Sequence, residues 1–399
     1  MKIGIIREEK QPADKRVAFT PEQCRQLKEC YQGLKLVVQP SQWRCYKDEE
    51  YQEQGISLQE NLSDCDVLFG IKEIPKEKLM QGKQYFFFSH TIKKQPHNKI
   101  LLQELVKKSI TMTDYECLTY TNEARVLGFG RYAGIVGTYN ALLAYGKRNN
   151  LFLLTPANHL QHYKPDIENE LKNIKLPAIK IVLTGGGRVA SGALEILDFM
   201  KIRKVAPQDF LTQDFSEPVY TQLNPEDYYT LNGKHEFDIH YLHHHPQQFK
   251  SDFLKYTKVA DVFISCHFWD NRADKLFTKE DAKAPGFKIE VIADITCDIN
   301  GSVPTTIRSS KIEDPIYGYN PQTEMEDEPF KENVITVMAV DNLPCELPRD
   351  SSHDFGKDLM DKVMPHLLGD DADKMIERAT ICKAGKLMPA FEYLSDYIA

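Results

Sequence analysis

One segment of this chain constrains its fold more than any other. Residues 181–197 read IVLTGGGRVASGALEIL, an apolar strand followed by three glycines and an amphipathic helix. Gly185 permits the tight turn, and Gly187 lets the main chain approach an anion closely. Arg188 and Val189 begin the helix, whose unpaired N–H groups and positive dipole end point at the same anion. The segment therefore predicts a parallel α/β domain that binds the pyrophosphate of a dinucleotide.

The position of this turn predicts a second domain. It begins at Ile181 of 399 residues, so a complete folded unit is expected before it. Short apolar strands alternate with helical segments in both halves, which is typical of doubly wound sheets. Strands are expected over 2–6, 35–39, 67–71, 84–88 and 110–114, and then over 180–184, 259–266, 288–295 and 334–340. Helices are expected over 21–31 and, as a link between the two series, over 134–148, whereas the polar stretch 213–250 is expected to be an insertion or surface excursion.

Composition excludes several classes of protein. Hydrophobic residues make up 42% of the chain and charged residues 27%, which is typical of a soluble globular protein. The net charge is −8 and cations are dispersed among acids, so neither nucleic acid nor an anionic membrane is an expected partner. The first residues enter a strand without a secretory segment, which predicts a cytoplasmic location. Small molecules are the expected partners, and homo-oligomer formation stays open.

Cysteine and histidine patterns predict no metal site. The nine cysteines are scattered and include no C-x-x-C pair, so reduced thiols are expected rather than disulfides or a zinc site. His235, His240 and His243 to His245 lie close together in the sequence. Consecutive histidines in one extended segment do not all face one ion, so a polar loop is expected there.

The choice between NAD and NADP is undecided. Ala190 stands at the usual third glycine position, with Gly192 two residues later. The second strand is expected within residues 202–209, and no acid follows it where a ribose-binding carboxylate is usual. Arg203 and Lys204 either favour a 2′-phosphate, and so NADP, or are ordinary solvated strand ends.

Candidate acid and base groups lie at strand ends in the first domain. Lys72 follows the apolar strand VLFGI, and His90 follows the strand QYFFF. Ligands of open α/β sheets bind at the carboxyl ends of strands, so the two side chains are expected to share one cleft. Apolar surroundings lower the pKa of a lysine from about 10.4 and make it a usable base. Arg16 and Arg125 adjoin apolar runs and are either carboxylate-binding groups or parts of structural ion pairs.

Seven segments in order along nearly the whole chain carry a family resemblance. They are 16–21 (RVAFTP), 70–73 (GIKE), 88–93 (FSHTIK), 114–116 (DYE), 125–130 (RVLGFG), 294–298 (DITCD) and 340–348 (VDNLPCELP). Together they resemble the lysine-forming saccharopine dehydrogenases, and still more the lysine ketoglutarate reductase half of the bifunctional enzyme of lysine breakdown. The wider superfamily includes alanine dehydrogenase and the transhydrogenase nucleotide-binding subunits.

The resemblance implies a fold and a set of roles. It implies two Rossmann-like domains with a cleft between them, the dinucleotide-binding domain of residues 133–337 being inserted into a catalytic domain of residues 1–132 and 338–399. Lys72 matches the proton-accepting lysine of the family, His90 its proton-donating histidine, and Glu116 a carboxylate that tunes both. The implied substrate contacts are Arg16, Gln95, Arg125 and Phe129, with Arg131 an additional cation that relatives can lack. The implied cofactor contacts are Gly185, Gly187, Arg188, Val189, His267 and Asp298, although Thr184 replaces a family glycine.

These roles describe one reaction. Saccharopine has three carboxylates and a secondary amine, so its site needs several cations and an acid/base pair of matched pKa. In the oxidative direction, neutral Lys72 is expected to take the proton of the amine while hydride passes to NAD or NADP. His90 then acts as the acid/base group in the hydrolysis of the imine to lysine and 2-oxoglutarate. Two rivals stay open: an alanine dehydrogenase or other amino-acid-derived imine reductase, and a non-catalytic nucleotide-binding regulatory protein.

Overall fold

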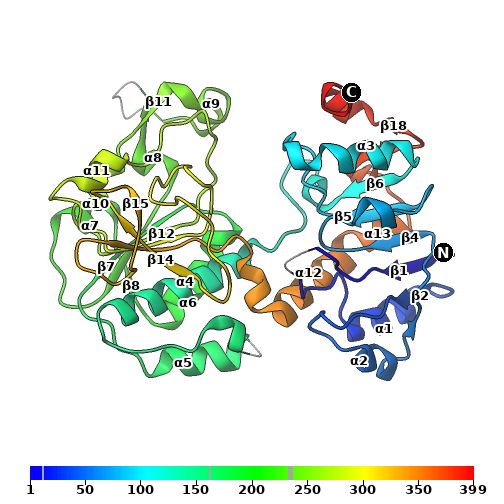
Figure 1. Ribbon diagram of the computed structural model, residues 1–399, viewed down its shortest axis with the longest axis horizontal. Coiled ribbons are helices and arrows are strands. Elements are labelled where there is room, and N and C mark those ends of the chain that lie inside the picture. The colour runs from blue at the N-terminus through cyan, green and yellow to red at the C-terminus, as the bar shows by residue number, and fades with distance from the viewer. Residues whose placement is uncertain (11–12, 161–162, 232–236) are drawn as a thin grey trace. The chain divides into compact units, whose positions relative to one another are not determined.

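The computed structural model describes residues 1–10, 13–160, 163–231 and 237–399, and these form two compact units. Unit 1 comprises Met1–Phe129 and Pro348–Ala399, and unit 2 comprises Gly130–Leu347. The blue-to-cyan start and the orange-to-red end of the chain therefore share one unit (Figure 1). The second crossing lies at 347/348 rather than the expected 337/338. The short helix η7 (Leu343–Glu346) packs on α4 of unit 2, which keeps residues 339–347 in that unit.

Unit 1 is built on an eight-stranded sheet with the order β18-β17-β6-β5-β4-β1-β2-β3. Its first six strands along the chain are parallel, and β17 and β18 add an antiparallel edge. Alternate side chains of β4 and β5 enter two cores: Phe69 and Phe86 pack on one face, and Leu68 and Phe87 on the other. The strands are β1 (Lys2–Ile5), β2 (Lys35–Val38), β3 (Ser57–Leu58), β4 (Val67–Phe69), β5 (Gln84–Phe87), β6 (Thr111–Asp114), β17 (Thr380–Lys383) and β18 (Lys386–Leu387).

Helices cover the sheet of unit 1. The first begins where its sequence indicates: the Thr20 hydroxyl accepts a hydrogen bond from Gln23 N at 3.3 Å, and Gln23 Oε1 accepts one from Thr20 N at 2.9 Å. Pro21 occupies the first turn, where no N–H is needed. The helices are α1 (Pro21–Cys30), α2 (Asp48–Glu53), α3 (Lys99–Lys107), α12 (Pro348–Lys362), α13 (Met364–Leu368), α14 (Met375–Ala379) and α15 (Ser395–Ile398), with 3₁₀ turns η1 (Lys76–Lys78), η2 (Pro96–Asn98), η3 (Tyr115–Cys117) and η8 (Pro389–Leu394).

Unit 2 is built on a second eight-stranded sheet with the order β15-β14-β16-β13-β12-β7-β9-β8. The strands from β16 to β8 are parallel, whereas β14 and β15 are antiparallel. The fold class predicted from the sequence, two α/β units with largely parallel sheets, is confirmed. The strands are β7 (Lys180–Thr184), β8 (Arg203–Lys204), β9 (Val219–Leu223), β12 (Val262–Ser265), β13 (Val291–Asp294), β14 (Ile316–Asn320), β15 (Met325–Asp327) and β16 (Ile335–Met338), and a separate hairpin contains β10 (Tyr229–Leu231) and β11 (Phe249–Ser251).

Two glycines bring the longest described helix of unit 2 close to the helix after the glycine turn. A Cβ on Gly134 would lie 1.8 Å from Val189 O, and a Cβ on Gly192 would lie 1.8 Å from Arg131 O. The expected helix 134–148 therefore starts earlier, at Gly130, and packs on α6 within unit 2. The helices are α4 (Gly130–Arg148), α5 (Glu168–Lys172), α6 (Arg188–Phe199), α7 (Pro207–Thr212), α8 (Pro225–Tyr228), α9 (Ile239–His244), α10 (Leu254–Thr257) and α11 (Lys279–Lys283), with the short turns η4 (Ala157–His159), η5 (Tyr163–Ile167), η6 (Pro246–Gln248) and η7.

The expectation for residues 213–250 is partly wrong. This stretch contains β9, which pairs with the glycine-turn strand β7 in the middle of the sheet, and the short elements α8, β10 and α9. Thr221 and Leu223 of β9 are buried although the surrounding sequence is polar. His240, His243 and His244 belong to α9 rather than to a loop, and His235 lies outside the described residues.

Candidate active site

The carboxyl ends of four parallel strands bring ionisable groups to one edge of unit 1. Strands β6, β5, β4 and β1 are consecutive in the sheet. Glu8 follows β1, Lys72 follows β4, His90 follows β5 and Glu116 follows β6. Lys72 and His90 therefore follow neighbouring strands, as the sequence predicts. This edge is where open α/β sheets bind ligands.

Lys72 has the properties of a base. Its side chain is only partly exposed, and its Nζ makes no hydrogen bond or ion pair with the residues that the structure describes. Burial lowers the pKa of Lys72, and the positive charges of Arg16 and Lys10 lower it further, against the opposing effect of Asp14 and Glu73. A lysine of lowered pKa is neutral in a larger fraction of molecules and accepts a proton more readily.

A carboxylate orients His90. Glu73 Oε1 lies 2.6 Å from His90 Nδ1, and Glu73 Oε2 accepts a hydrogen bond from Lys10 Nζ at 2.9 Å. Burial alone raises the pKa of Glu73, but the hydrogen bonds of His90 and Lys10 outweigh it and lower that pKa to about 2. The ionised carboxylate accepts a hydrogen bond from Nδ1–H, so Nε2 is the basic nitrogen of the neutral ring.

The backbone at His90 is also unusual. Its φ is 53°, in the left-handed region that residues other than glycine seldom adopt. Asn98 Nδ2 donates a hydrogen bond to the His90 carbonyl at 3.1 Å, and the Phe88 ring stacks on the imidazole with centroids 6.2 Å apart. Contacts on both sides thus hold a strained residue, an arrangement that is frequent at functional sites.

Glu116 pairs with cations, and its expected effect on the pKa values of Lys72 and His90 stays a prediction. Its Oε1 forms an ion pair with Arg125 and lies 3.9 Å from Lys93 Nζ. Its side chain is 10% exposed, whereas that of Arg125 is 51% exposed. The carboxylate bonded to His90 is Glu73, and Glu116 instead anchors two cations at the end of β6.

Arg16 forms a buried ion pair with Asp14, and its expected contact with substrate stays a prediction. Its guanidinium contacts Asp14 at two points, Nε to Oδ1 at 3.0 Å and Nη2 to Oδ2 at 2.6 Å, and both residues are at most 3% exposed. The guanidinium carbon also lies 4.1 Å from the centroid of the Phe129 ring, which stacks on Phe355. Arg16 and Phe129 are therefore brought together, while Gln95 is an exposed residue whose carbonyl accepts a hydrogen bond from the Tyr397 hydroxyl.

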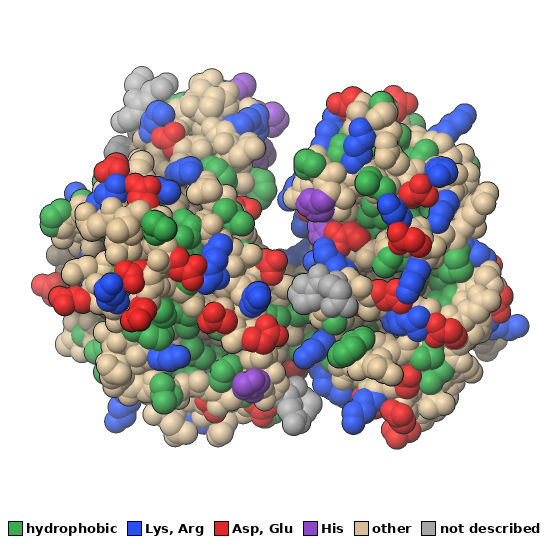
Figure 2. Space-filling model, viewed as in Figure 1, with side chains coloured by type: hydrophobic (Ala, Val, Ile, Leu, Met, Phe, Trp, Pro, Cys, Tyr) green, Lys and Arg blue, Asp and Glu red, His purple; other side chains and the backbone are tan. Residues whose placement is uncertain are grey.

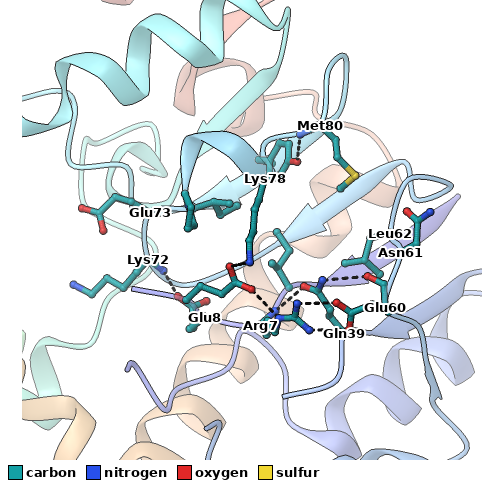
Figure 3. A pocket seen from close by; sticks show the side chains of 15 residues that line it. Arg7, Glu8, Gln39, Glu60, Asn61, Leu62, Lys72, Glu73, Lys78 and Met80 are labelled. Carbon is teal, nitrogen blue, oxygen red and sulfur yellow. Dashed lines mark hydrogen bonds and ion pairs between the residues drawn. The ribbon is translucent and has the colours of Figure 1, made fainter. Parts of the chain in front are cut away.

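Sequence reasoning missed two carboxylates of this edge, Glu8 and Glu73. Glu8 accepts hydrogen bonds from Ile71 N at 2.6 Å and from Lys72 N at 2.9 Å. The rule that selected Lys72, a polar residue just after an apolar strand, also applies to Glu8. Figure 3 shows the pocket of about 260 Å³ beside them, with Lys72 and Glu73 pointing away from Arg7, Gln39 and Glu60.

The glycine turn of unit 2 has the geometry of an anion site. Gly185 has a φ of 99°, and a Cβ there would lie 2.6 Å from Cys266 O, so the turn requires glycine. Gly187 caps the N-terminus of α6, and a Cβ on it would meet no atom within 4 Å. Open space therefore lies above Gly187 beside the N-terminus of a twelve-residue helix, which fits a dinucleotide pyrophosphate.

The other predicted cofactor contacts differ in exposure. His267 is buried: its Nδ1 lies 2.7 Å from Thr184 Oγ1 and its Nε2 lies 2.9 Å from Ser302 Oγ. Burial lowers the pKa of His267 to about 4, so the ring is neutral at physiological pH. Arg188 and Asp298 are exposed, and Val189 packs against α4.

The second strand of unit 2 lies within residues 202–209 as expected, but it is not the neighbour of the glycine-turn strand. Arg203 and Lys204 form β8 at the edge of the sheet, and the strand that pairs with β7 is β9. Arg203 forms an ion pair with Glu217 at 2.8 Å, and Lys204 Nζ donates to Gln222 at 2.8 Å. The residue after β9 is Asn224, whose Oδ1 would lie 3.1 Å from a Cβ on Gly186. An amide therefore stands beside the turn where a ribose-binding acid is usual.

Arg131 does not lie in the unit that contains Lys72. It belongs to α4 of unit 2, where Nε and Nη2 bond Glu195 of α6 at 2.5 and 2.7 Å. The Tyr163 hydroxyl contacts the same carboxylate at 3.3 Å. Arg131 therefore joins α4 to α6, and its expected contact with substrate stays a prediction.

One group of potential metal ligands was not predicted. His366 Nδ1 lies 3.4 Å from Asp371 Oδ1 and 3.2 Å from Asp373 Oδ1. Asp371 also accepts hydrogen bonds from Ile376 N and Glu377 N, and Asp373 accepts one from Met375 N. Capping of the short helix α14 therefore explains both carboxylates without an ion.

Surface and membrane features add little to the site. Basic and acidic side chains are interspersed over the visible face of both units, without a large area of one sign (Figure 2). Among the described residues, no helix combines the length and the apolar character that a membrane span requires.

Comparison with known proteins identifies the relatives of this chain. Residues 4–136 match the family described as alanine dehydrogenase/PNT, N-terminal domain. An alpha-aminoadipic semialdehyde synthase of Arabidopsis thaliana is 28% identical over 98% of this chain, which spans 41% of that protein. A saccharopine dehydrogenase [NAD(+), L-lysine-forming] of Candida glabrata is 24% identical, with 89% of both chains covered.

A solved L-alanine dehydrogenase shares the fold, with a TM-score of 0.64 at 15% identity and complete coverage of both chains. The resemblance inferred from the sequence is therefore confirmed. The chain is similar over nearly its full length to alpha-aminoadipic semialdehyde synthases and saccharopine dehydrogenases, and its residues 4–136 carry the match to the alanine dehydrogenase/PNT N-terminal domain.

Proposed function

We propose that this protein is an NAD- or NADP-dependent oxidoreductase that interconverts saccharopine with L-lysine and 2-oxoglutarate. The observation that carries the proposal is the pair of groups at the ends of β4 and β5. Lys72 is a lysine of lowered pKa, and His90 is a histidine oriented by the carboxylate of Glu73. The names of the relatives support this choice of substrate, since several are saccharopine dehydrogenases.

In the oxidative direction, Lys72 in its neutral form accepts the proton of the secondary amine. A bound nicotinamide dinucleotide supplies the hydride acceptor. His90 accepts a proton at Nε2 from the water that adds to the resulting imine, and returns a proton to the nitrogen that leaves as lysine. Glu73 keeps the proton on Nδ1 throughout, so Nε2 exchanges protons in both directions.

Unit 2 supplies the residues that would hold the dinucleotide. The open space above Gly187 and the N-terminus of α6 fit the pyrophosphate. Neutral His267 adds no charge next to the turn.

Unit 1 supplies cations for the substrate. The exposed cation Arg125, together with Lys93, is suited to a substrate carboxylate, because Glu116 already fixes their position.

The experiment is a substrate panel. The protein is incubated with NADH or NADPH and one of three mixtures: lysine with 2-oxoglutarate, ammonia with pyruvate, or ammonia with 2-oxoglutarate. Nucleotide oxidation is followed by absorbance, and saccharopine is identified by mass spectrometry. Oxidation with lysine and 2-oxoglutarate alone is expected. Oxidation with ammonia and pyruvate instead would point to an alanine dehydrogenase, and nucleotide binding without any turnover would point to a regulatory protein.

A further inference from the structure

We propose that Glu8 is a positioning residue for Lys72: its carboxylate fixes the Ile71–Lys72 main chain and so sets where the lysine side chain begins. The inference concerns the site of the proposed function, but its central measurement needs no substrate. Glu8 has no role in the proton transfers described above.

The backbone shows why a side chain is needed at this point. Ile6 N donates to Phe69 O at 2.9 Å, which is the last backbone hydrogen bond between the end of β1 and the end of β4 among those described. On the other side, Gly70 N donates to Phe86 O at 2.9 Å and Phe88 N donates to Ile71 O at 3.0 Å. The segment after β4 therefore keeps its backbone hydrogen bonds to the β5 side, although it no longer has any described backbone hydrogen bond to the β1 side.

The Glu8 side chain accepts hydrogen bonds from the main chain after β4, on the side where backbone pairing with β1 has ended. Its Oε1 accepts from Ile71 N at 2.6 Å and its Oε2 from Lys72 N at 2.9 Å, so each carboxylate oxygen bonds one of two successive N–H groups. Figure 3 shows the contact from Glu8 to the main chain of Lys72. A Cβ on Gly70 would lie only 3.4 Å from Glu8 Oε1, so the carboxylate packs directly on the chain. An ionised carboxylate accepts at both oxygens, whereas an amide has only one acceptor.

The charges around Glu8 make this contact sensitive to protonation. Burial raises the pKa of Glu8 to about 8, and Asp14 raises it as well, while the N–H groups of Ile71 and Lys72 and the cation Arg16 oppose the rise. Protonation converts one acceptor oxygen into a donor, which weakens the contact to one of the two N–H groups. The contact is therefore strongest above the pKa of Glu8 and weakens as the pH falls through it.

The neighbouring residue offers a matched control. Glu9 is the adjacent carboxylate side chain, and it forms ion pairs with Arg7 and Lys78 at the pocket. Its described contacts do not include the main chain of Lys72. Glu9→Gln therefore removes one charge from the same segment without touching the proposed contact, whereas Glu8→Gln keeps the shape of the side chain and removes one of its acceptors.

The test measures the pKa of Lys72 directly. Wild type, Glu8→Gln and Glu9→Gln are acylated briefly with acetic anhydride across a pH series, and the modification of each lysine is quantified by mass spectrometry, with exposed Lys35 as the internal reference. Burial is the main cause of the lowered Lys72 pKa. Release of the main chain in Glu8→Gln is expected to admit water and move the Lys72 midpoint up, towards about 10.4. Glu9→Gln is expected to leave it in place.

The proposal would be overturned if the Lys72 acylation midpoint of Glu8→Gln equalled that of Glu9→Gln, or if it fell below that of the wild type. Turnover gives a second reading: kcat is expected to fall by about tenfold to a hundredfold in Glu8→Gln, because small displacements of a reacting group are costly, with a much smaller change in KM. Equal kcat in the two variants would also overturn it. If the wild type turns over no lysine and 2-oxoglutarate, the proposed function fails while the acylation midpoints still decide the role of Glu8.

Discussion

At the carboxyl edge of its sheet, unit 1 presents ionisable side chains, whereas the glycine turn of unit 2 presents bare backbone beside a neutral imidazole. Lys72, His90 and Glu73 define the first edge, and their pKa values or hydrogen bonds are set by one another. Gly187 and the neutral ring of His267 define the second. In the proposed function, the same α/β frame serves proton transfer where ionisable residues follow the strands, and anion binding where glycines do. The difference predicts that a substitution at the edge of unit 1 lowers turnover, whereas a substitution at the glycine turn of unit 2 weakens dinucleotide binding.

Removal of the proposed base has the largest expected effect. Lys72→Met is expected to lower turnover by about 10²–10⁴-fold, because general base catalysis contributes that much. Dinucleotide affinity, measured by fluorescence titration, is expected to stay within twofold of wild type, since that ligand is expected at the glycine turn. Loss of affinity together with turnover would contradict the division of labour between the two edges.

A charge placed at the glycine turn has the opposite signature. Gly187→Asp is expected to keep the melting temperature, because aspartate caps helices well, and to raise the dinucleotide Kd by about tenfold to a hundredfold. The reason is that its carboxylate fills the open space and repels a pyrophosphate.

Two further variants of unit 2 serve as controls for Gly187→Asp. Gly286 is also unobstructed, so Gly286→Asp adds the same charge elsewhere and is expected to leave the Kd unchanged. Gly185→Ala is expected to lower the melting temperature instead, because its Cβ would collide with Cys266 O at 2.6 Å. Equal Kd values for the Gly187 and Gly286 variants would show that the turn is not the anion site.

The carboxylate on His90 gives a smaller effect that depends on pH. Glu73→Gln is expected to lower kcat by about tenfold, because the amide no longer holds the proton on Nδ1. The pKa of Glu73 is lowered from about 4.5 to about 2, so its stabilising contribution is complete above about pH 4.5 and disappears as the pH falls towards 2.

Urea unfolding of wild type and variant at several pH values measures this contribution. A difference in unfolding free energy of about 2 kcal/mol at pH 6, shrinking towards zero near pH 2, is expected. A difference that is constant with pH would mean that the ion pair with His90 and Lys10 is not its source.

The smallest effect is expected at Arg131. Its guanidinium is bonded to Glu195 in unit 2, and both side chains are about one-third exposed. Arg131→Gln is therefore expected to change the KM values for lysine and 2-oxoglutarate by less than twofold and the unfolding free energy by less than about 1 kcal/mol. A rise of tenfold or more in either KM would instead show that Arg131 contacts the substrate.

Local patterns predicted the parts of the site that depend on one strand end or one turn. Gly185, Lys72 and His90 each directly follow an apolar strand or lie close behind it, so periodicity alone places them at an edge. The pairing of Glu73 with His90 joins residues 17 positions apart through the loops after two strands, and no local pattern contains that contact. Glu8 was accessible to the same rule as Lys72 but was not considered.

The sheet of unit 2 shows where periodicity fails. Strand β9 contains Tyr220, Thr221 and Gln222, a polar sequence, yet it pairs with β7 over its whole length. The short strand β8 occupies the position along the chain where the second strand was expected, but the sheet places it at the edge. Only the order of strands in space reveals that Asn224, and not residues 202–209, follows the strand beside the glycine turn.

The central claim is that unit 1 supplies the acid/base groups for hydride transfer to and from saccharopine. The most direct measurement incubates the protein with lysine, 2-oxoglutarate and nucleotide deuterated at C4 of the reduced nicotinamide, and examines the product by mass spectrometry. Saccharopine that carries one deuterium is expected with the wild type, and none is expected with Lys72→Met although it still binds the nucleotide. Unlabelled saccharopine, or labelled product at the wild-type rate from Lys72→Met, would contradict the account.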